Sequence, residues 1–312
     1  MGGPDSLEAI EPFLYNLFSD RELIQLPAGA LLQKPFAKLI SSRRAKKVTE
    51  NYDMIGGKSP LLEWTQKQAA GTAQRLGEQV KPYVIMRYWH PRAEAVLAEI
   101  KTAGIDRAVV VSMYPHYTGA TTGSSINDFK QAAAKVHPAL DYQLIEEWHD
   151  WPAYLDSLAN RVNEGLDRFH DLMRDEVQIL FSAHALPQKF IDRGDPYRDH
   201  VAATVRGVMA RVGSYDWSIA YQSRSGPVKW MEPGTEEALH KLAEEGHRAL
   251  LVVPISFVSD HIETLEEIDI QYHNLAVSLG IVNFVRAPSL NDHDDFLDAL
   301  AALVADRCPT IV

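Results

Sequence analysis

The apolar and polar positions along the chain follow two patterns, one typical of strands and the other typical of helices. Short continuous apolar runs are typical of strands buried on both faces of a parallel sheet, and they occur at residues 83–86, 108–112, 177–181, 217–222 and 249–254. Apolar residues at three- and four-residue steps predict helices, here at residues 61–76, 91–103, 151–172, 199–212, 236–244 and 296–305. Strands that alternate with helices of this length predict an α/β fold with mostly parallel sheets. Two such halves with a cleft between them are the simplest architecture.

Residues 248–280 form the most informative stretch of the sequence. The buried strand at 249–254 is followed by a short turn and then by an amphipathic helix. The apolar stripe of this helix comprises Leu265, Ile268, Tyr272, Leu275 and Leu279, and the opposite side carries Glu263, Glu267, Gln271 and Asn274. Two carboxylates one helical turn apart, just beyond the carboxyl end of a strand, lie where open α/β sheets bind ligands. A helix face that is merely solvated is the alternative interpretation.

The N-terminal region is rich in bulky apolar residues and is followed by a basic run. Residues 7–32 carry more large apolar side chains than one core-facing stripe requires. They predict either a well-buried helical hairpin or an apolar lip for a flat ligand or a membrane surface. Arg43, Arg44, Lys46 and Lys47 follow directly. Such a run is typical of a solvated face, but beside an apolar lip it suits the carboxylates of an amphipathic ligand.

Composition limits the class of protein. The 312 residues are 46% hydrophobic and 23% charged, which is typical of a globular protein of two domains. The net charge of -11 argues against a general nucleic-acid binder. The one cysteine, Cys308, excludes internal disulfides and a cysteine-ligated zinc or iron–sulfur site within one chain. No apolar run approaches the ~20 residues that span a bilayer, and residues 1–10 lack the features of a signal peptide. We therefore expect a cytoplasmic protein.

Histidines and carboxylates follow three of the predicted strands. They are His116, His184, His261, Glu263 and Glu267. A single histidine at a strand end is more often packed and hydrogen-bonded than catalytic. One imidazole opposite one or two carboxylates, however, suits a divalent first-row metal and has too few soft ligands for copper or permanent structural zinc. The same groups provide a base and a proton acceptor. The sequence therefore predicts an open, weakly chelating metal site.

A family resemblance sharpens this prediction. Nine motifs occur in order along the chain: MGGPDS (1–6), IGGKSP (55–60), MRYWHP (86–91), YPHY (114–117), TTGSS (121–125), FSAHALP (181–187), RGDPY (193–197), QSRSGPVKW (222–230) and SDHIETLEEID (259–269). Together they resemble the signatures of ferrochelatases over nearly the whole chain. The resemblance implies an enzyme of the lyase class that inserts Fe²⁺ into protoporphyrin IX with release of two protons, the terminal step of haem biosynthesis. It also implies two Rossmann-like, chelatase-type domains, each with a four-stranded parallel sheet, and a porphyrin cleft between them. We expect domains at 1–130 and 131–312.

The resemblance also assigns roles to individual residues. His184 matches the family's invariant histidine and Glu263 its partner, and the two are assigned to iron binding and pyrrole deprotonation. Glu267 continues an acidic ladder of metal-binding groups along a helix that contains π-turns in the family, and the next rung is the neutral Gln271. The residues that match the porphyrin site are Met1, Arg44, Tyr52, Arg87, Tyr88, Gln222, Ser223 and Trp230, and those that match the apolar lip are Leu14, Leu17 and Leu23. We expect His184 and Glu263 to face each other across a gap that admits a tetrapyrrole.

Two departures from the family pattern lead to further expectations. Because Cys308 stands alone, we expect no [2Fe–2S] centre and no other cofactor, with Fe²⁺ as a substrate. The family has a short apolar strand before its Gly-Gly-Pro turn, whereas this sequence begins at that turn. We expect the true start to lie upstream of Met1, because loss of an inner strand leaves backbone groups unpaired.

The expected partners are the porphyrin and Fe²⁺, with peripheral membrane contact through the lip as an open alternative and no protein partner indicated.

Two alternative functions stay open at this point. One is a related chelatase for coproporphyrin, or for cobalt and a corrin precursor. The length of the chain and the string DHIETLEEID favour the protoporphyrin branch. The other is a non-catalytic haem or porphyrin carrier. The presence of both His184 and Glu263 speaks against a carrier, which needs an axial ligand but no base opposite it.

Overall fold

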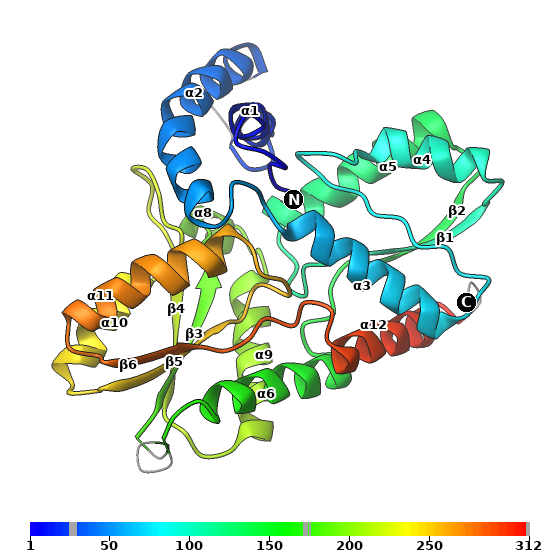
Figure 1. The fold of residues 1–312 in the computed structure, drawn as a ribbon. Coiled ribbons are helices and arrows are strands. Elements are labelled where there is room, and N and C mark those ends of the chain that lie inside the picture. The colour runs from blue at the N-terminus through cyan, green and yellow to red at the C-terminus, as the bar shows by residue number, and fades with distance from the viewer. Residues whose placement is uncertain (25–29, 171–173, 175, 310–312) are drawn as a thin grey trace. The chain divides into compact units, whose positions relative to one another are not determined.

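The computed structural model describes residues 1–24, 30–170, 174 and 176–309 (Figure 1). The chain forms two compact units. The first comprises Met1–Ser112, Tyr117–Glu146 and the residues from Leu303 onward, and the second comprises Met113–His116 and Glu147–Ala302. The predicted boundary after residue 130 falls inside helix α5 (Ser124–Val136), whose residues all belong to the first unit. These compact units differ from the expected domains, whose bounds stay a prediction.

The second unit is built on a four-stranded parallel sheet with the strand order β4-β3-β5-β6. Its strands are β3 (Gln178–His184), β4 (Trp217–Gln222), β5 (Ala249–Pro254) and β6 (Asn283–Arg286). The two central strands, β3 and β5, come from the continuous apolar runs and are almost wholly buried. This confirms the predicted parallel sheet of four strands for the second half of the chain. The short strand β6 was not predicted, because four residues with polar ends carry too weak a pattern.

Helices cover both faces of this sheet. On one face, Leu180 of β3 and Leu250 of β5 pack with residues of α10 (Thr235–Glu244) and α11 (His273–Ser278). On the other side lie α6 (Pro152–Leu166) and α9 (Tyr197–Val212) (Figure 1). Helix α6 approaches the sheet so closely that a β-carbon added at Gly165 would lie 2.6 Å from Cδ1 of Leu251. Burial of each large apolar side chain in these layers contributes about 1.5–3 kcal/mol to the free energy of unfolding.

The first unit contains a smaller sheet. Strands β1 (Arg107–Val111) and β2 (Asp141–Ile145) pair in parallel, and they are its two strands among the described residues. Helices α4 (Ala93–Thr102) and α5 enclose an apolar core with them. The predicted strand at 83–86 is wrong: Tyr83 and Ile85 pack their side chains against this core, but the segment forms no strand ladder. The four-stranded sheet implied for the first domain is therefore not found in the described part of this unit.

The N-terminal segment forms helices that the pattern largely predicted. Helix α1 (Ile10–Ser19) packs against the long helix α2 (Ala30–Met54), so the described parts of residues 7–32 form the predicted hairpin. Residues 25–29 lie outside the described part of the chain. Helix α3 (Leu61–Leu76) has the predicted bounds. Within the described residues, every helix is too short or too polar to cross a lipid bilayer.

The remaining helices differ from the predicted ones mainly in where they end and in their helix type. The helix predicted at 151–172 ends at Leu166, and Leu172 lies outside the described residues. The short helix α8 (Gln188–Asp192) follows β3, and α12 (Asp294–Arg307) closes the chain. In the described part of the chain two segments are π-helical: η1 (Gly119–Gly123) and η2 (Glu263–Tyr272). The second confirms the π-turns that the family resemblance implied for the helix carrying Glu263.

Candidate functional site

The candidate site lies at the carboxyl edge of the four-stranded sheet. His184 is the last residue of β3, and it is in register with Gln222, the last residue of β4. Glu263 opens η2, which follows β5 after a short turn. Because parallel strands present their carboxyl ends at one edge, this topology gathers polar side chains that are about 40 to 80 residues apart in the sequence.

His184 and Glu263 are in direct contact. Nδ1 of His184 lies 2.9 Å from Oε2 of Glu263, and the two side chains are 36% and 24% exposed. The expectation that these groups face each other across a gap is therefore wrong for this structure, since both belong to the second unit and are hydrogen-bonded. The reason is topological: the strand ending in His184 is the immediate neighbour of the strand that leads to Glu263.

The electrostatics of the pair follow from this contact. Burial opposes ionisation of Glu263, but the charge and hydrogen bond of His184, together with His261, hold the pKa of Glu263 well below its usual range. Burial also disfavours the imidazolium of His184, yet the Glu263 carboxylate outweighs it and raises the pKa of His184. Nε2 of His261 lies 3.7 Å from the same carboxylate. Burial and the charge of Glu263 raise the pKa of the nearby Tyr114 phenol.

The backbone of His184 is held by two residues to which the sequence analysis assigned no role. The hydroxyl of Ser256 accepts a hydrogen bond from the backbone N–H of His184 at 3.1 Å. The hydroxyl of Tyr197 lies 2.9 Å from the carbonyl oxygen of His184 and 2.7 Å from Oγ of Ser256. The motif RGDPY contained Tyr197, but nothing in that string indicated that its phenol reaches the end of β3. These contacts fix the backbone from which the imidazole projects.

Glu267 lies in a dense hydrogen-bond network. Its Oε1 accepts from the backbone N–H of Ser223 and from the hydroxyl of Tyr272, both at 2.8 Å. Its Oε2 accepts from Nε2 of Gln222 at 2.9 Å and from the hydroxyl of Ser223. Ser223 has a φ of 64°, in the left-handed region that is uncommon for residues other than glycine. The structure thus brings together Glu267, Gln222 and Ser223, all of which were predicted as site residues, and adds Tyr272.

Two predicted residues of the second unit have other surroundings. His116 is buried, and its Nε2 hydrogen-bonds the hydroxyl of Thr204 at 2.9 Å. Burial and the charges of His149 and His200 lower the pKa of His116 to about 3. It is therefore a neutral, packed histidine rather than a partner of Glu263. Trp230 is half-buried beside the loop that follows β3, where it forms an antiparallel bridge with Pro187.

The remaining predicted porphyrin-site residues belong to the first unit. The carbonyl oxygen of Met1 accepts a hydrogen bond from the backbone N–H of Tyr88. Arg87 pairs with Asp20 at 3.1 Å and with Asp128 at 3.3 Å. The phenol of Tyr88 donates to the same carboxylate of Asp20 at 2.7 Å. Asp20 was not predicted as a site residue, because a buried acid 67 residues away from its arginine leaves no local pattern in the sequence.

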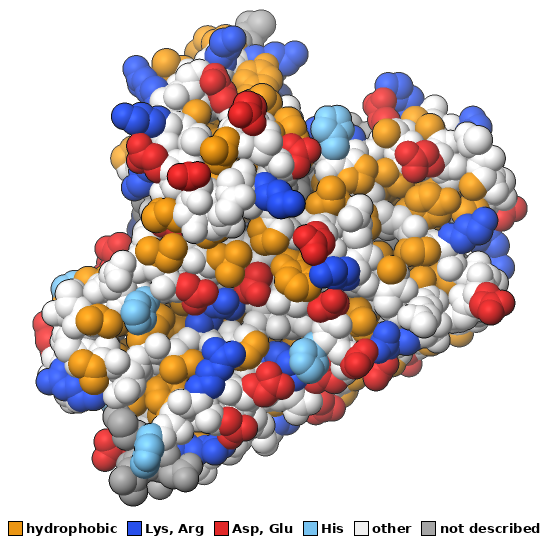
Figure 2. Space-filling view, in the orientation of Figure 1, with side chains coloured by type: hydrophobic (Ala, Val, Ile, Leu, Met, Phe, Trp, Pro, Cys, Tyr) orange, Lys and Arg blue, Asp and Glu red, His pale blue; other side chains and the backbone are white. Residues whose placement is uncertain are grey.

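Arg44, Tyr52 and the lip leucines also lie in the first unit. Arg44 is exposed on α2, with its guanidinium 5.6 Å from the centre of the Phe18 ring, and Figure 2 shows Lys and Arg side chains over this helix. Tyr52 is buried. Leu14 is also buried, whereas Leu17 and Leu23 are half-buried. The hairpin interpretation therefore holds for Leu14, and the lip stays a prediction for the other two.

A shallow groove of about 720 Å³ lies between α1 and α2. Its lining mixes the acidic Glu8 and Glu11 with the basic Lys34 and Lys38. The groove belongs to the first unit and contains none of the predicted metal-binding residues. We therefore place the candidate chemistry at the His184–Glu263 pair and not in this groove.

Comparisons with known proteins agree with the motifs. The family model for ferrochelatases matches residues 1–308. A ferrochelatase of Geotalea daltonii is 52% identical, over 97% of this chain and 94% of its own length. A ferrochelatase of Picosynechococcus is 46% identical, over 99% of this chain and 82% of its own length.

Solved structures with a similar fold include a chelatase. SirB from Bacillus subtilis with Fe³⁺ has a TM-score of 0.56 at 11% identity, over 80% of this chain and 93% of its own. The sirohydrochlorin chelatase SirB from Bacillus subtilis subspecies spizizenii, in complex with cobalt, has a TM-score of 0.52 at 12% identity, over 78% and 92%. At these identities the likeness shows the fold alone. It confirms the predicted chelatase-type α/β fold, while the predicted cleft between the two units stays a prediction.

Proposed function

Because the chain belongs to the ferrochelatase family, we propose that its His184–Glu263 pair carries the insertion of Fe²⁺ into a porphyrin. The observation that supports this assignment is the 2.9 Å contact between the imidazole and the carboxylate at the carboxyl edge of the sheet. Fe²⁺ and the porphyrin are the substrates, and haem is the product. Within the range of porphyrins, we propose protoporphyrin IX as the substrate.

The geometry of the pair assigns a role to each atom. Glu263 engages Nδ1 of His184, so the Nδ1–H donates to the carboxylate and Nε2 carries the lone pair. A porphyrin must lose two pyrrole protons when the metal enters. His184 accepts one pyrrole proton at Nε2, and the charge of Glu263 stabilises the imidazolium that forms, as a buried carboxylate does in other histidine–acid pairs. The imidazolium releases this proton to solvent, and His184 is then free to accept the second pyrrole proton. In this arrangement His184 is the base and Glu263 is its charge partner.

Strain of the substrate completes the mechanism. The nitrogen lone pairs of a flat tetrapyrrole point inward, and a bent ring exposes them to the metal. Bending costs about 1–5 kcal/mol, which binding energy at the rim of the ring offsets. We propose that Trp230 takes part in this grip, because its indole N–H is buried and has no hydrogen-bond partner among the described residues. The porphyrin-binding roles of Met1, Arg44, Tyr52, Arg87 and Tyr88 stay predictions.

The surroundings of Glu267 favour a positioning role over metal binding. Its two carboxylate oxygens already accept four hydrogen bonds, from Gln222, Ser223 and Tyr272. A metal ion at this carboxylate would have to displace at least one of these donors. We therefore propose that Glu267 fixes the end of β4, and that Gln222 and Ser223 are held by it where the porphyrin is predicted to bind.

The remaining assignments are coarser. We propose that the enzyme works without an iron–sulfur cluster, because the sequence contains one cysteine, Cys308, and its side chain is buried. Peripheral membrane contact through Leu17 and Leu23, and a cytoplasmic location, stay predictions. A carrier or a chelatase of another tetrapyrrole is not favoured, because the similar relatives are ferrochelatases.

A chelation assay tests the proposal. Porphyrin fluorescence is followed after addition of Fe²⁺ without oxygen, or of Zn²⁺ as a stable substitute, with protoporphyrin IX and coproporphyrin in parallel. We expect metal-dependent loss of the emission of the metal-free porphyrin with turnover, faster with protoporphyrin IX. Tight porphyrin binding with no turnover would instead show a carrier, and preference for coproporphyrin would overturn the proposed substrate.

A further inference from the structure

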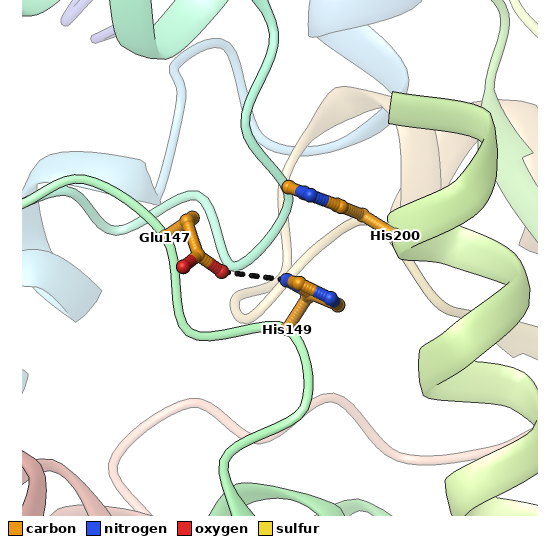
Figure 3. A group of neighbouring side chains, drawn as sticks. All are labelled: Glu147, His149 and His200. Atoms are coloured by element: carbon orange, nitrogen blue, oxygen red, sulfur yellow. Dashed lines mark hydrogen bonds and ion pairs between the residues drawn. The ribbon is translucent and has the colours of Figure 1, made fainter. Parts of the chain in front are cut away.

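A second group of metal-binding side chains lies apart from the His184–Glu263 pair. Glu147, His149 and His200 each offer one ligand atom, and these three atoms lie within 4.8 Å of one another (Figure 3). Nδ1 of His149 lies 2.6 Å from Oε2 of Glu147. The rings of His149 and His200 stack, with centroids 3.7 Å apart and planes at 7°. All three residues are half-buried, so the cluster is accessible to a small ion.

The segment that carries Glu147 and His149 is firmly anchored. Trp148, which separates them, is fully buried and packs edge-on against Tyr154 with ring centroids 4.8 Å apart. Its backbone N–H donates to the carbonyl oxygen of Pro115 at 3.0 Å. The buried indole therefore sets the position of the two ligands that flank it.

The same segment is tied to α9, the helix that carries His200. Thr204, one turn after His200, places its hydroxyl 2.7 Å from the carbonyl oxygen of His149. The same hydroxyl lies 2.9 Å from Nε2 of the buried His116. These bonds hold the two ligand-bearing segments in place relative to each other. Ligands that are positioned in advance in this way favour metal binding.

We propose that Glu147, His149 and His200 bind a divalent first-row transition metal ion, with water at the remaining positions. Two imidazoles and one carboxylate suit Zn²⁺, Co²⁺, Fe²⁺ or Ni²⁺, whereas Mg²⁺ and Ca²⁺ prefer oxygen ligands alone. The site does not depend on the role proposed for His184.

Metal binding requires small changes that the geometry allows. Two ligands at about 2.1 Å from one ion lie at most about 4.2 Å apart, so any pair of ligand atoms near the 4.8 Å limit must move closer together. The stacked imidazoles must also turn apart to aim their lone pairs at the ion. The ion takes the place of the proton between His149 and Glu147, and this proton is released to solvent.

The test uses cobalt chloride as the probe in a full-length H184A background, which disables the proposed substrate site. Visible absorption reports Co²⁺ bound by imidazole, and equilibrium dialysis gives the number of bound ions. We expect H184A to bind one Co²⁺ that Zn²⁺ displaces and Mg²⁺ does not. Adding His200→Ala should abolish the signal, and adding Glu147→Gln should weaken binding at least about tenfold. His240→Ala is the matched control, because His240 is an exposed histidine of the same unit.

The outcomes are decisive in both directions. Loss of the cobalt signal with H200A but not with H240A supports the site, provided that circular dichroism shows both variants folded. If H200A does not fold, weaker or lost Co²⁺ binding by E147Q and by His149→Gln supports the site instead. Equal Co²⁺ binding by H184A and by its H200A or E147Q derivatives would overturn the proposal, as would the absence of Co²⁺ binding by H184A.

Discussion

Ser223 donates two hydrogen bonds to Glu267, one from its backbone N–H and one from its hydroxyl, so that each carboxylate oxygen receives one of them. The two residues come from the end of β4 and the middle of η2, and Ser223 has a positive φ at this point. A strained backbone persists where its surroundings determine it. The contact therefore joins the strand end to the π-helix that carries Glu263.

Glu267→Gln tests whether this carboxylate positions its neighbours or binds the metal. An amide NH₂ in place of one oxygen faces N–H and O–H donors, so we expect a loss of about 1–3 kcal/mol in stability and a lower melting temperature. We also expect a higher KM for porphyrin with an unchanged KM for the metal. Glu236→Gln, at an exposed position of α10, is the matched control. A metal-specific rise in KM without loss of stability would show that Glu267 is a metal ligand.

His184→Ala tests the assignment of the base. General-base catalysis contributes typically 10²–10⁴-fold, so we expect chelation to fall by at least about a hundredfold. Porphyrin affinity, measured by fluorescence quenching, should change little, because the imidazole acts on the protons and not on the rim of the ring. The exposed His240 again provides the control substitution. Turnover of H184A close to that of the unmodified enzyme would remove His184 from the mechanism.

Glu263→Gln tests the electrostatic coupling within the pair. The Glu263 carboxylate raises the pKa of His184, against the lowering caused by burial. A base must be neutral to act, so activity falls on the acid side as pH drops through the pKa of His184. Removal of the charge lowers that pKa, and we expect the acid limb of the kcat/KM profile to move to lower pH while the plateau falls. The pH dependence of Zn²⁺ insertion measures this shift, and a shift to higher pH would contradict the proposed roles.

The central strands of the second unit were predictable from the sequence, because strands that are buried on both faces consist of apolar residues. The run at 249–254 could be assigned without its partners, since a strand enclosed by helices on both faces is apolar throughout. The strand β2 was missed because Asp141 and Gln143 interrupt its apolar positions. The segment 83–86 was wrongly predicted as a strand. Its apolar residues Tyr83 and Ile85 pack against the core, but the segment pairs with no neighbouring strand.

The residues that gather at the carboxyl edge of the four-stranded sheet were predictable from the sequence, but the distances between them were not. Strand ends and motifs indicated His184, Gln222 and Glu263, because topology alone gathers such positions. The hydrogen bond between His184 and Glu263 depends on strand order, which a sequence pattern does not contain. Buried partners such as Tyr197 and Asp20 were missed, since a polar side chain that pairs with a distant residue leaves no periodic signal.

Asp260, just before η2, is the centre of a second hydrogen-bond network. Its carboxylate accepts from Arg286 at 2.9 Å, from Ser289 at 2.7 Å and from Asn291 at 2.9 Å. Arg286 also forms a two-bond pair with Asp269, farther along η2. Burial opposes ionisation of Asp260, but the charge of Arg286 and these hydrogen bonds outweigh it and lower the pKa of Asp260. The network holds the π-helix in place behind the candidate site.

Asp260→Asn should therefore lower stability in a pH-dependent way. Because the pKa of Asp260 is lower in the folded state than in the unfolded state, its ionised form stabilises the fold above the unfolded pKa of about 3.9. That contribution is lost as pH falls through the folded pKa. At neutral pH we expect the variant to lose about 1–3 kcal/mol, and at pH values below the lowered pKa of Asp260 to approach the stability of the unmodified protein. Melting temperatures across this range measure the effect, with Asp292→Asn, at an exposed position, as the control for the change of charge. A deficit that does not shrink in acid would mean that packing, and not the charge of Asp260, holds η2.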